Sequence, residues 1–312
     1  MLVFSVSDKG GTGRSVTSTN VAYRAALSGY NTCYLDFDFG SPTVGAIFDV
    51  EHAVTGVRGD GVHDYLAGRA PATRRIDVWT DTNRDSFRRP PGAGSLTLLP
   101  GSQGGAEFYE SFDAKAKQAK LMIDRCVDLF VRLDEEFDLV IVDLSAGRSF
   151  ASELVLQATI RPALQPVPAR WLVFHKWTRQ HIIAANNLVH GERGLYKSAA
   201  AIGHGENAMA AMLRFVRTAV IRQDSKTVEQ LRPSQQSWLA EVDRELEKMA
   251  SQLRLGRALR IGSIPLDPVL QWREQLLTNW DVHTLEIANQ DTVTAFEDLA
   301  RVVTDHTPWE GL

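Results

Sequence analysis

Short apolar runs alternate with amphipathic stretches along the whole chain, and this alternation predicts its secondary structure. Apolar runs bounded by glycine, proline or acidic residues predict buried strands at 2–7, 31–37, 96–99, 138–143, 163–167, 213–221 and 259–264. Apolar positions recurring at helical spacing predict helices at 15–27, 115–136, 178–190, 234–254 and 292–303. Strands that alternate with helices favour a doubly wound α/β fold, with a mostly parallel sheet flanked by helices.

The same pattern bears on domain organisation. No internal repeat or low-complexity linker interrupts it, so we expect a single domain over residues 1–312. Two segments are less regular. Residues 50–94 are rich in arginine and contain Pro90-Pro91-Gly92, which indicates loops around short elements, and residues 191–207 suggest a loop or an insertion.

The segment between the first predicted strand and the first predicted helix is dense in glycine and reads Asp8-Lys9-Gly10-Gly11-Thr12-Gly13-Arg14-Ser15. Glycines allow backbone N–H groups to converge on phosphate oxygens, and the start of the following helix adds partial positive charge. A hydroxyl at Ser15 can bind Mg²⁺, and a cation at Arg14 can reach the β- and γ-phosphates. The alternative is a glycine turn that binds no ligand.

Acidic residues follow two other predicted strands. Asp36 and Asp38 end the second strand, and Asp143 ends the strand at 138–143. In an open parallel sheet, the carboxyl ends of the strands face the crevice in which ligands bind. A carboxylate beside a phosphate loop holds Mg²⁺, usually through water. The alternative for Asp36 and Asp38 is a purely structural role in a turn.

The glycine loop resembles that of the deviant Walker A ATPases of the ParA/MinD family, whose loop reads K-G-G-x-G-K-[ST]. The resemblance implies a P-loop nucleotide hydrolase fold, ATP and Mg²⁺ as cofactors, and a homodimer. It implies that Lys9 reaches the nucleotide of the other subunit and that Arg14 binds phosphate in its own subunit. Arginine is longer and planar compared with the usual lysine, so we expect nucleotide binding with weakened hydrolysis.

The resemblance also assigns the remaining site residues. Asp38 orients the attacking water and, with Ser15 and Asp143, forms the metal shell. Nucleotide contacts fall on the loop and the start of its helix, namely Lys9, Gly10, Gly11, Thr12, Gly13, Arg14, Ser15 and Val16. The segment Ile264-Pro265-Leu266-Asp267 is similar to a late I-P-x-D segment of the family, which places Pro265 and Asp267 near the base. The asparagine that often contacts adenine in the family has no counterpart after residues 213–221, so adenine is inferred from the family alone.

Charge is unevenly distributed along the chain. The net charge is −4, but residues 161–260 carry 16 basic and 8 acidic side chains. This segment predicts non-specific DNA binding through clustered cations, including Arg170, Arg214 and Arg217. The alternative is a solvated, salt-bridged surface. Residues 281–312 contain seven acidic side chains and one arginine, which argues against a basic membrane-binding helix.

Composition argues against a membrane-spanning, secreted or disulfide-rich protein. Hydrophobic residues make up 44% of the chain, as in ordinary globular proteins, and no apolar run is long enough to cross a membrane. The N-terminus has no basic leader, and the two cysteines, Cys33 and Cys126, form no CxxC motif, so we expect a cytoplasmic protein without a disulfide framework.

Two functions remain open from the sequence. The first is a MgATP-dependent dimerising ATPase of the ParA type, which switches between a nucleotide-bound dimer and a monomer to position or partition DNA or another cargo. An activating partner protein would accompany this function. The second is a slow or non-hydrolysing nucleotide-binding sensor that serves as a scaffold for a partner protein. This alternative is open because Arg14 replaces the usual lysine.

Overall fold

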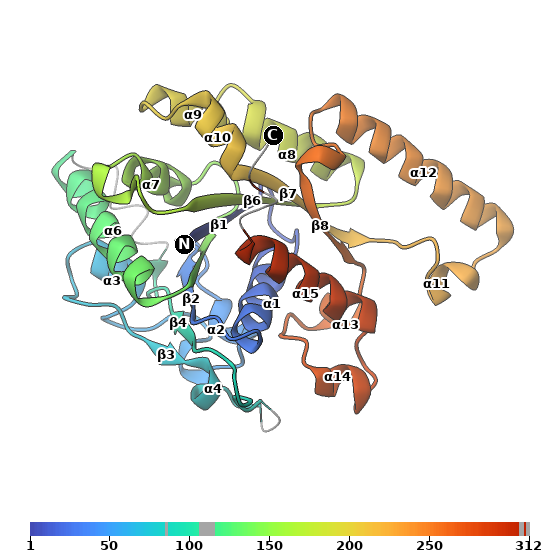
Figure 1. The fold of residues 1–312 in the computed structure, drawn as a ribbon, viewed down its shortest axis with the longest axis horizontal. Helices are drawn as coiled ribbons and strands as arrows, with labels where there is room; N and C mark the ends of the chain where they lie inside the picture. The colour runs from blue at the N-terminus through green and yellow to red at the C-terminus, as the bar shows by residue number, and fades with distance from the viewer. Residues whose placement is uncertain (85–86, 106–115, 306–308, 310–312) are drawn as a thin grey trace.

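The computed structural model describes residues 1–84, 87–105, 116–305 and 309, and within them eight strands form one sheet (Figure 1). The order across the sheet is β3-β4-β2-β5-β1-β6-β7-β8, with β3 antiparallel to β4 and all other neighbours parallel. The strands are β1 (Leu2–Val6), β2 (Thr32–Phe37), β3 (Ile76–Asp77), β4 (Leu96–Leu99), β5 (Leu139–Leu144), β6 (Ala169–Lys176), β7 (Leu213–Val220) and β8 (Arg260–Pro265).

Helices cover both faces of this sheet. The α-helices in the described residues are α1 (Arg14–Leu27), α2 (Val44–Ile47), α3 (Val62–Leu66), α4 (Val78–Asp81), α6 (Ala116–Glu136), α7 (Phe150–Thr159), α8 (Arg179–His190), α9 (Leu195–Ala201), α10 (Glu206–Met212), α11 (Lys226–Glu229), α12 (Pro233–Gln252), α13 (Pro268–Trp272), α14 (Asn279–His283) and α15 (Gln290–Thr304). Short 3₁₀ turns are η1 (Glu51–Ala53), η3 (Pro162–Leu164) and η4 (Arg257–Leu259).

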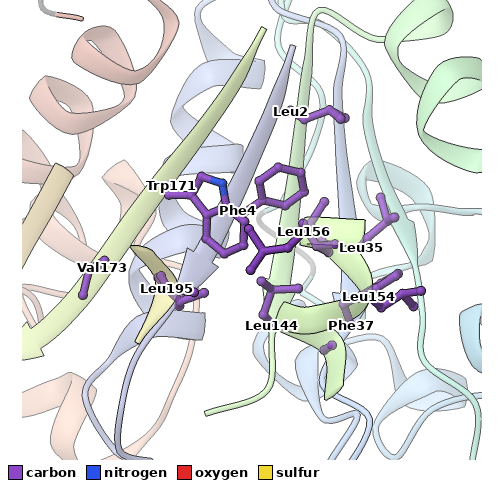
Figure 2. Packing of buried hydrophobic residues seen from close by; sticks show 14 of the residues in the cluster. Leu2, Phe4, Leu35, Phe37, Leu144, Leu154, Leu156, Trp171, Val173 and Leu195 are labelled. Carbon is purple, nitrogen blue, oxygen red and sulfur yellow. The ribbon is translucent and has the colours of Figure 1, made fainter. Parts of the chain in front are cut away.

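The central strand β1 is buried on both faces. Leu2, Phe4 and Val6 belong to a core shared with α6, α7 and α8, whereas Val3 belongs to a second core shared with α1 and α15. In Figure 2 the ring of Phe4 lies against Trp171 of β6, with 5.0 Å between the ring centroids. A strand covered on both faces needs apolar residues at successive positions, which explains why Ser5 is the only polar residue of β1.

Most of the predicted elements are present. The strands predicted at 2–7, 31–37, 96–99, 138–143, 213–221 and 259–264 end within one residue of β1, β2, β4, β5, β7 and β8. The predicted helices correspond to α1, α6, α8, α12 and α15, and their described ends agree within two residues. The doubly wound α/β fold with a mostly parallel sheet is therefore confirmed.

The strand predicted at 163–167 is wrong. Residues 162–164 form the 3₁₀ turn η3, and the strand of this region is β6, which begins at Ala169. Pro162, Pro166 and Pro168 have no N–H to donate to a ladder, which excludes this segment from the middle of a sheet. Arg170 and His175 lie near the ends of β6 and leave an apolar run of only four residues between them, so the full length of the strand does not stand out in the sequence.

The loop predicted at 191–207 is also wrong in part. This segment contains α9 and the start of α10, and Leu195, Ala199 and Met209 from the two helices are buried in the core beside α8. Helices of seven residues offer too few turns for an apolar period to stand out. The segment 50–94 does contain short elements joined by loops, as predicted.

The sheet brings three strand ends together. β1 lies between β5 and β6, and β2 lies beside β5, so the carboxyl ends of β1, β2 and β5 are neighbours at one edge. Figure 1 shows α1 running back along the sheet from this edge. Among the helices that the structure describes, none combines the length and the apolar character that crossing a bilayer requires.

Candidate functional site

The glycine loop joins β1 to α1 in a conformation that depends on glycine. Gly11 and Gly13 have φ angles of +69° and +74°, in the left-handed region that L side chains rarely adopt. A Cβ placed on Gly10 or Gly11 would meet no heavy atom within 4 Å, so this side of the loop is open. The hydroxyl of Thr218, near the end of β7, donates to the carbonyl of Thr12 at 2.5 Å and ties the loop to the sheet.

The helix that follows the loop supplies unpaired donors. The first N–H groups of an α-helix have no partner within the helix, and here the first turn contains Arg14, Ser15 and Val16. No acidic residue lies in that turn to offset the positive end of the helix dipole. An open glycine backbone that leads into a 14-residue helix can bind an anion such as a phosphate group.

Carboxylates from β2 and β5 face this loop. Asp36 and Asp143 are paired across the two strands, and Asp38 lies two residues beyond Asp36. The buried Asp36 carboxylate accepts the backbone N–H groups of Asp38 and Val44, both at 3.2 Å. Burial, and next the charge of Asp143, raises the pKa of Asp36 well above its usual range. Asp36 therefore shapes the turn that presents Asp38.

Arg14 fills the space between these acidic groups. Its Nε donates to Oδ1 of Asp143 at 2.6 Å, and its Nη2 lies 3.3 Å from Oδ2 of Asp38. The same Nη2 lies 3.4 Å from Oγ of Ser15, and Nη1 lies 3.5 Å from Oγ of Ser7. Burial lowers the pKa of Arg14, but the charges of Asp143 and Asp38 outweigh it, so that the pKa is raised overall.

The predicted loop residues are thus divided between two environments. Lys9 is exposed to solvent at the tip of the loop, while its own carbonyl accepts the hydroxyl of Ser7 at 3.0 Å. Arg14 is buried together with Asp143, and Ser15 and Asp38 lie beside the two. The structure therefore places Ser15, Asp38 and Asp143 around the guanidinium of Arg14.

Pro265 and Asp267 lie farther along the same edge, at the end of β8. Pro265 lines a cavity of about 590 Å³ together with Val220, Arg222 and Asn289. Asp267 is buried, and its two carboxylate oxygens accept the N–H groups of Val269 and Asn289 at 3.2 and 3.0 Å. Asp267 therefore caps α13 and holds the loop before α15, a structural role that the sequence did not suggest.

Three further residues connect the segments of the site and were missed by sequence reasoning. Ser145 accepts the N–H of Phe39 at 2.9 Å through Oγ, which joins the loop after β5 to the loop after β2. Thr218 and Ser7 hold the glycine loop, as described above. A single sequence shows which residues end its strands, but the hydroxyl contacts depend on which strands become neighbours.

The oxygen atoms at this site are of the kind that a hard divalent cation binds, but they are too few to complete its coordination. Hydroxyl and carboxylate oxygens are the ligands that Mg²⁺ prefers. Oδ2 of Asp143 is buried without a hydrogen-bond partner among the described residues, so a metal-bound water would satisfy it. The described residues contain no group of three or more His, Cys, Asp or Glu side chains that could hold a metal alone. The remaining ligands would come from phosphate and water.

Part of the predicted DNA-binding set is buried. Arg217 donates from Nη1 and Nη2 to the two carboxylate oxygens of Glu247, and its guanidinium lies 3.6 Å from the ring centre of Trp177. Arg170 donates to the carbonyl of Val303, and Arg214 donates to the carbonyls of residues 210, 211 and 213. These three arginines hold β6 and β7 against neighbouring elements, so their assignment to a DNA-binding surface is wrong.

Comparisons with known proteins agree on the fold. No protein-family model matches the sequence, and no curated protein matches it. Among solved structures, the MinC:MinD cell division protein complex of Aquifex aeolicus aligns with a TM-score of 0.57 and 17% identity, over 97% of this chain and 95% of that chain. MinD of Pyrococcus horikoshii, complexed with Mg-ADP, aligns with a TM-score of 0.51 and 16% identity, over 97% and 96%. A ParA family ATPase of Chlorobium tepidum aligns with a TM-score of 0.55 and 15% identity, over 96% and 98%. The chain therefore has the fold of the ParA/MinD-type P-loop ATPases.

Proposed function

We propose that this chain is an ATPase of the ParA type, which binds MgATP, dimerises in that state and returns to a monomer after hydrolysis. The observation that carries the proposal is a glycine loop, open at Gly10 and Gly11, at the edge where Asp38 and Asp143 both contact Arg14. The ParA/MinD fold supports it, and the Mg-ADP bound to the Pyrococcus MinD supports the choice of cofactor.

Each part of the site has a role in this proposal. The N–H groups of the loop and of the first turn of α1 bind the phosphates, and Gly11 and Gly13 allow the left-handed backbone of this loop. Ser15, Asp38 and Asp143 would hold Mg²⁺, which neutralises charge on the phosphate oxygens when it is bound. Asp38, at the mouth of the site, orients the attacking water.

Lys9 has a separate role. It is exposed at the tip of the loop, and its ammonium makes none of the ion pairs found among the described residues. An exposed cation beside a phosphate site is free to reach a neighbouring subunit, so we assign Lys9 to the nucleotide of the partner copy. Pro265 lies beside the cavity at the ends of β7 and β8, which has room for a base.

The proposal is tested by mass and turnover together. The molar mass in solution should double with a non-hydrolysable ATP analogue and Mg²⁺, and it should return to that of one chain with ADP. Lys9→Ala should bind nucleotide but stay monomeric, whereas Lys197→Ala, which removes an exposed lysine paired to Glu192, should behave as the unchanged protein. A monomer under every nucleotide condition would refute the dimer switch.

A second candidate function is a nucleotide sensor that hydrolyses ATP slowly or not at all. The contacts of Arg14 with Asp143 and Asp38 favour it, because these carboxylates belong to the proposed hydrolytic machinery. Measurable turnover that is lost in Asp38→Ala supports the ATPase. Tight ATP binding without turnover, with DNA present as well, supports the sensor.

DNA is the cargo that the charge distribution favours. With Arg170, Arg214 and Arg217 buried, any DNA surface in residues 161–260 must use exposed cations. Those in the described structure are Arg161, Arg179, Arg193, Lys197, Arg222, Arg232, Arg244, Lys248, Arg254 and Arg257. Arg254 and Arg257 lie together between α12 and β8, which makes them the first residues to change.

A further inference from the structure

The guanidinium of Arg14 contacts all three residues that are proposed to hold the metal. Nε donates to Asp143 at 2.6 Å, and Nη2 lies 3.3 Å from Asp38 and 3.4 Å from Ser15. The side chain is 8% exposed, and that of Asp143 is fully buried. A cation thus lies among these oxygens in the structure, and it belongs to the chain itself.

The charge of this region requires such a cation. Asp36 and Asp143 are neighbours across β2 and β5, and Asp38 contacts the same guanidinium as Asp143. Buried carboxylates are costly to ionise unless a positive charge compensates them. A divalent cation would have to displace this guanidinium or share its oxygens against electrostatic repulsion.

We propose that Arg14 is a built-in counter-cation that excludes divalent metal from Ser15, Asp38 and Asp143 until a nucleoside triphosphate binds. The phosphates offer the guanidinium a second anionic partner, and its transfer to them frees the carboxylates. Metal binding is therefore conditional on nucleotide binding in this chain. The inference rests on the proposed nucleotide site, but the exclusion of metal from the free protein can be measured without nucleotide.

Arginine suits this role better than lysine does. The guanidinium is a planar fork, and here two of its nitrogens, Nε and Nη2, reach two different carboxylates at once. A lysine carries its charge on a single atom at the end of a flexible stem. In Arg14→Lys we therefore expect at least one of the two carboxylates to be released.

Titration of the nucleotide-free protein with Mn²⁺, followed by the electron paramagnetic resonance signal of free Mn²⁺, tests the proposal. Arg14→Met should bind Mn²⁺ more tightly than the unchanged protein by a factor on the order of 10, and Arg14→Lys should lie between them. Arg161→Met removes one exposed arginine far along the chain and should leave the Mn²⁺ affinity unchanged. Equal Mn²⁺ affinity in the unchanged protein and in folded Arg14→Met would overturn the proposal.

A second measurement decides the matter if Arg14→Met fails to fold. The unchanged protein and Asp143→Asn are titrated with Mn²⁺ in the absence of nucleotide. We expect the two to bind Mn²⁺ equally weakly, because Arg14 keeps the metal from Asp143. Tight binding in the unchanged protein that Asp143→Asn abolishes would overturn the proposal. Failure of ATP to bind, measured separately in EDTA and in Mg²⁺, would refute the proposed function and leave this result standing.

Discussion

The Nε of Arg14 donates a 2.6 Å hydrogen bond to Oδ1 of Asp143, and this contact ties the first turn of α1 to the end of β5. Both side chains are buried, so each depends on the other for charge compensation. The pair therefore contributes to the fold as well as to the site.

Removal of one partner of this pair should destabilise the protein. Arg14→Met leaves the buried Asp143 carboxylate without its cation, and we expect the free energy of unfolding at pH 7 to fall by about 3 kcal/mol. Asp143→Asn should cost a similar amount, and the double variant should cost less than the sum of the two. Urea denaturation of the four proteins measures this coupling, and strictly additive losses would contradict it.

Asp36 should make stability depend on pH in an unusual direction. The folded protein holds the proton of this carboxyl to a higher pH than the unfolded chain, because burial and Asp143 raise its pKa above the ordinary 3.8. Folding therefore takes up a proton above pH 3.8, and the free energy of unfolding falls as the pH rises through that range, by up to about 1.4 kcal/mol per pH unit.

Asp36→Asn should flatten this part of the profile. Urea unfolding between pH 4 and pH 7, within the range in which the unchanged protein is folded, provides the measurement. The two proteins are compared by the slope of the free energy of unfolding against pH and not by its absolute value. Asparagine keeps only one of the two oxygens that accept the N–H groups of Asp38 and Val44, so Asp36→Asn also loses stability at every pH. Parallel profiles for the two proteins would show that Asp36 titrates normally.

Two glycines of the loop should respond differently to alanine. Gly13 has a φ of +74°, so Gly13→Ala should lower the free energy of unfolding by about 1–2 kcal/mol through backbone strain. Gly10 faces open space, and Gly10→Ala should change stability by less than about 0.5 kcal/mol. Its methyl group should nevertheless weaken nucleotide binding about 10-fold by blocking close approach of the phosphates. Unchanged affinity in Gly10→Ala would place the phosphates elsewhere.

The DNA-binding proposal depends on exposed cations. Arg254→Gln with Arg257→Gln should leave the melting temperature nearly unchanged, because both side chains are exposed. If DNA contacts this surface, the slope of the logarithm of affinity against the logarithm of salt concentration should decrease by about 2. Fluorescence anisotropy with a non-specific duplex and an ATP analogue provides the measurement. An unaltered slope would exclude this surface.

Arg217 should behave as a structural residue instead. The buried Arg217 side chain donates two hydrogen bonds to the partly exposed Glu247 and stacks on Trp177. Arg217→Met should therefore lower the free energy of unfolding by about 2 kcal/mol. Arg257→Met is the matched control, since the same change at an exposed position should cost less than about 0.5 kcal/mol. Similar losses in the two variants would mean that Arg217 is not held as the structure has it.

Much of the fold could be predicted from the sequence because a buried parallel strand has a clear local signature. β1, β2 and β5 are buried along their whole length, and either a glycine loop follows the strand or an aspartate lies near its end. Their extent and their common edge therefore follow from the residues. β6 could not be predicted in the same way. Arg170 and His175, near its ends, are polar yet buried. Arg170 donates to the carbonyl of Val303, a partner far along the chain that the local pattern does not reveal.

In the site, too, some features could be predicted from the sequence and others could not. The loop and the strand ends predict that Ser15, Asp38 and Asp143 lie close together, and in the structure each of them contacts Arg14. The sequence predicts that the charge of Arg14 reaches the phosphates, and the structure shows its guanidinium in contact with the carboxylates of Asp143 and Asp38. That position depends on the rotamer of one long side chain and on the local density of negative charge, which a linear motif does not encode.

Calorimetric titration of the folded protein with ATP and Mg²⁺ tests the central claim most directly. The account predicts a saturable heat of binding at one nucleotide per chain, weakened in Gly10→Ala. The absence of any heat with every nucleoside triphosphate in the presence of Mg²⁺ would contradict it.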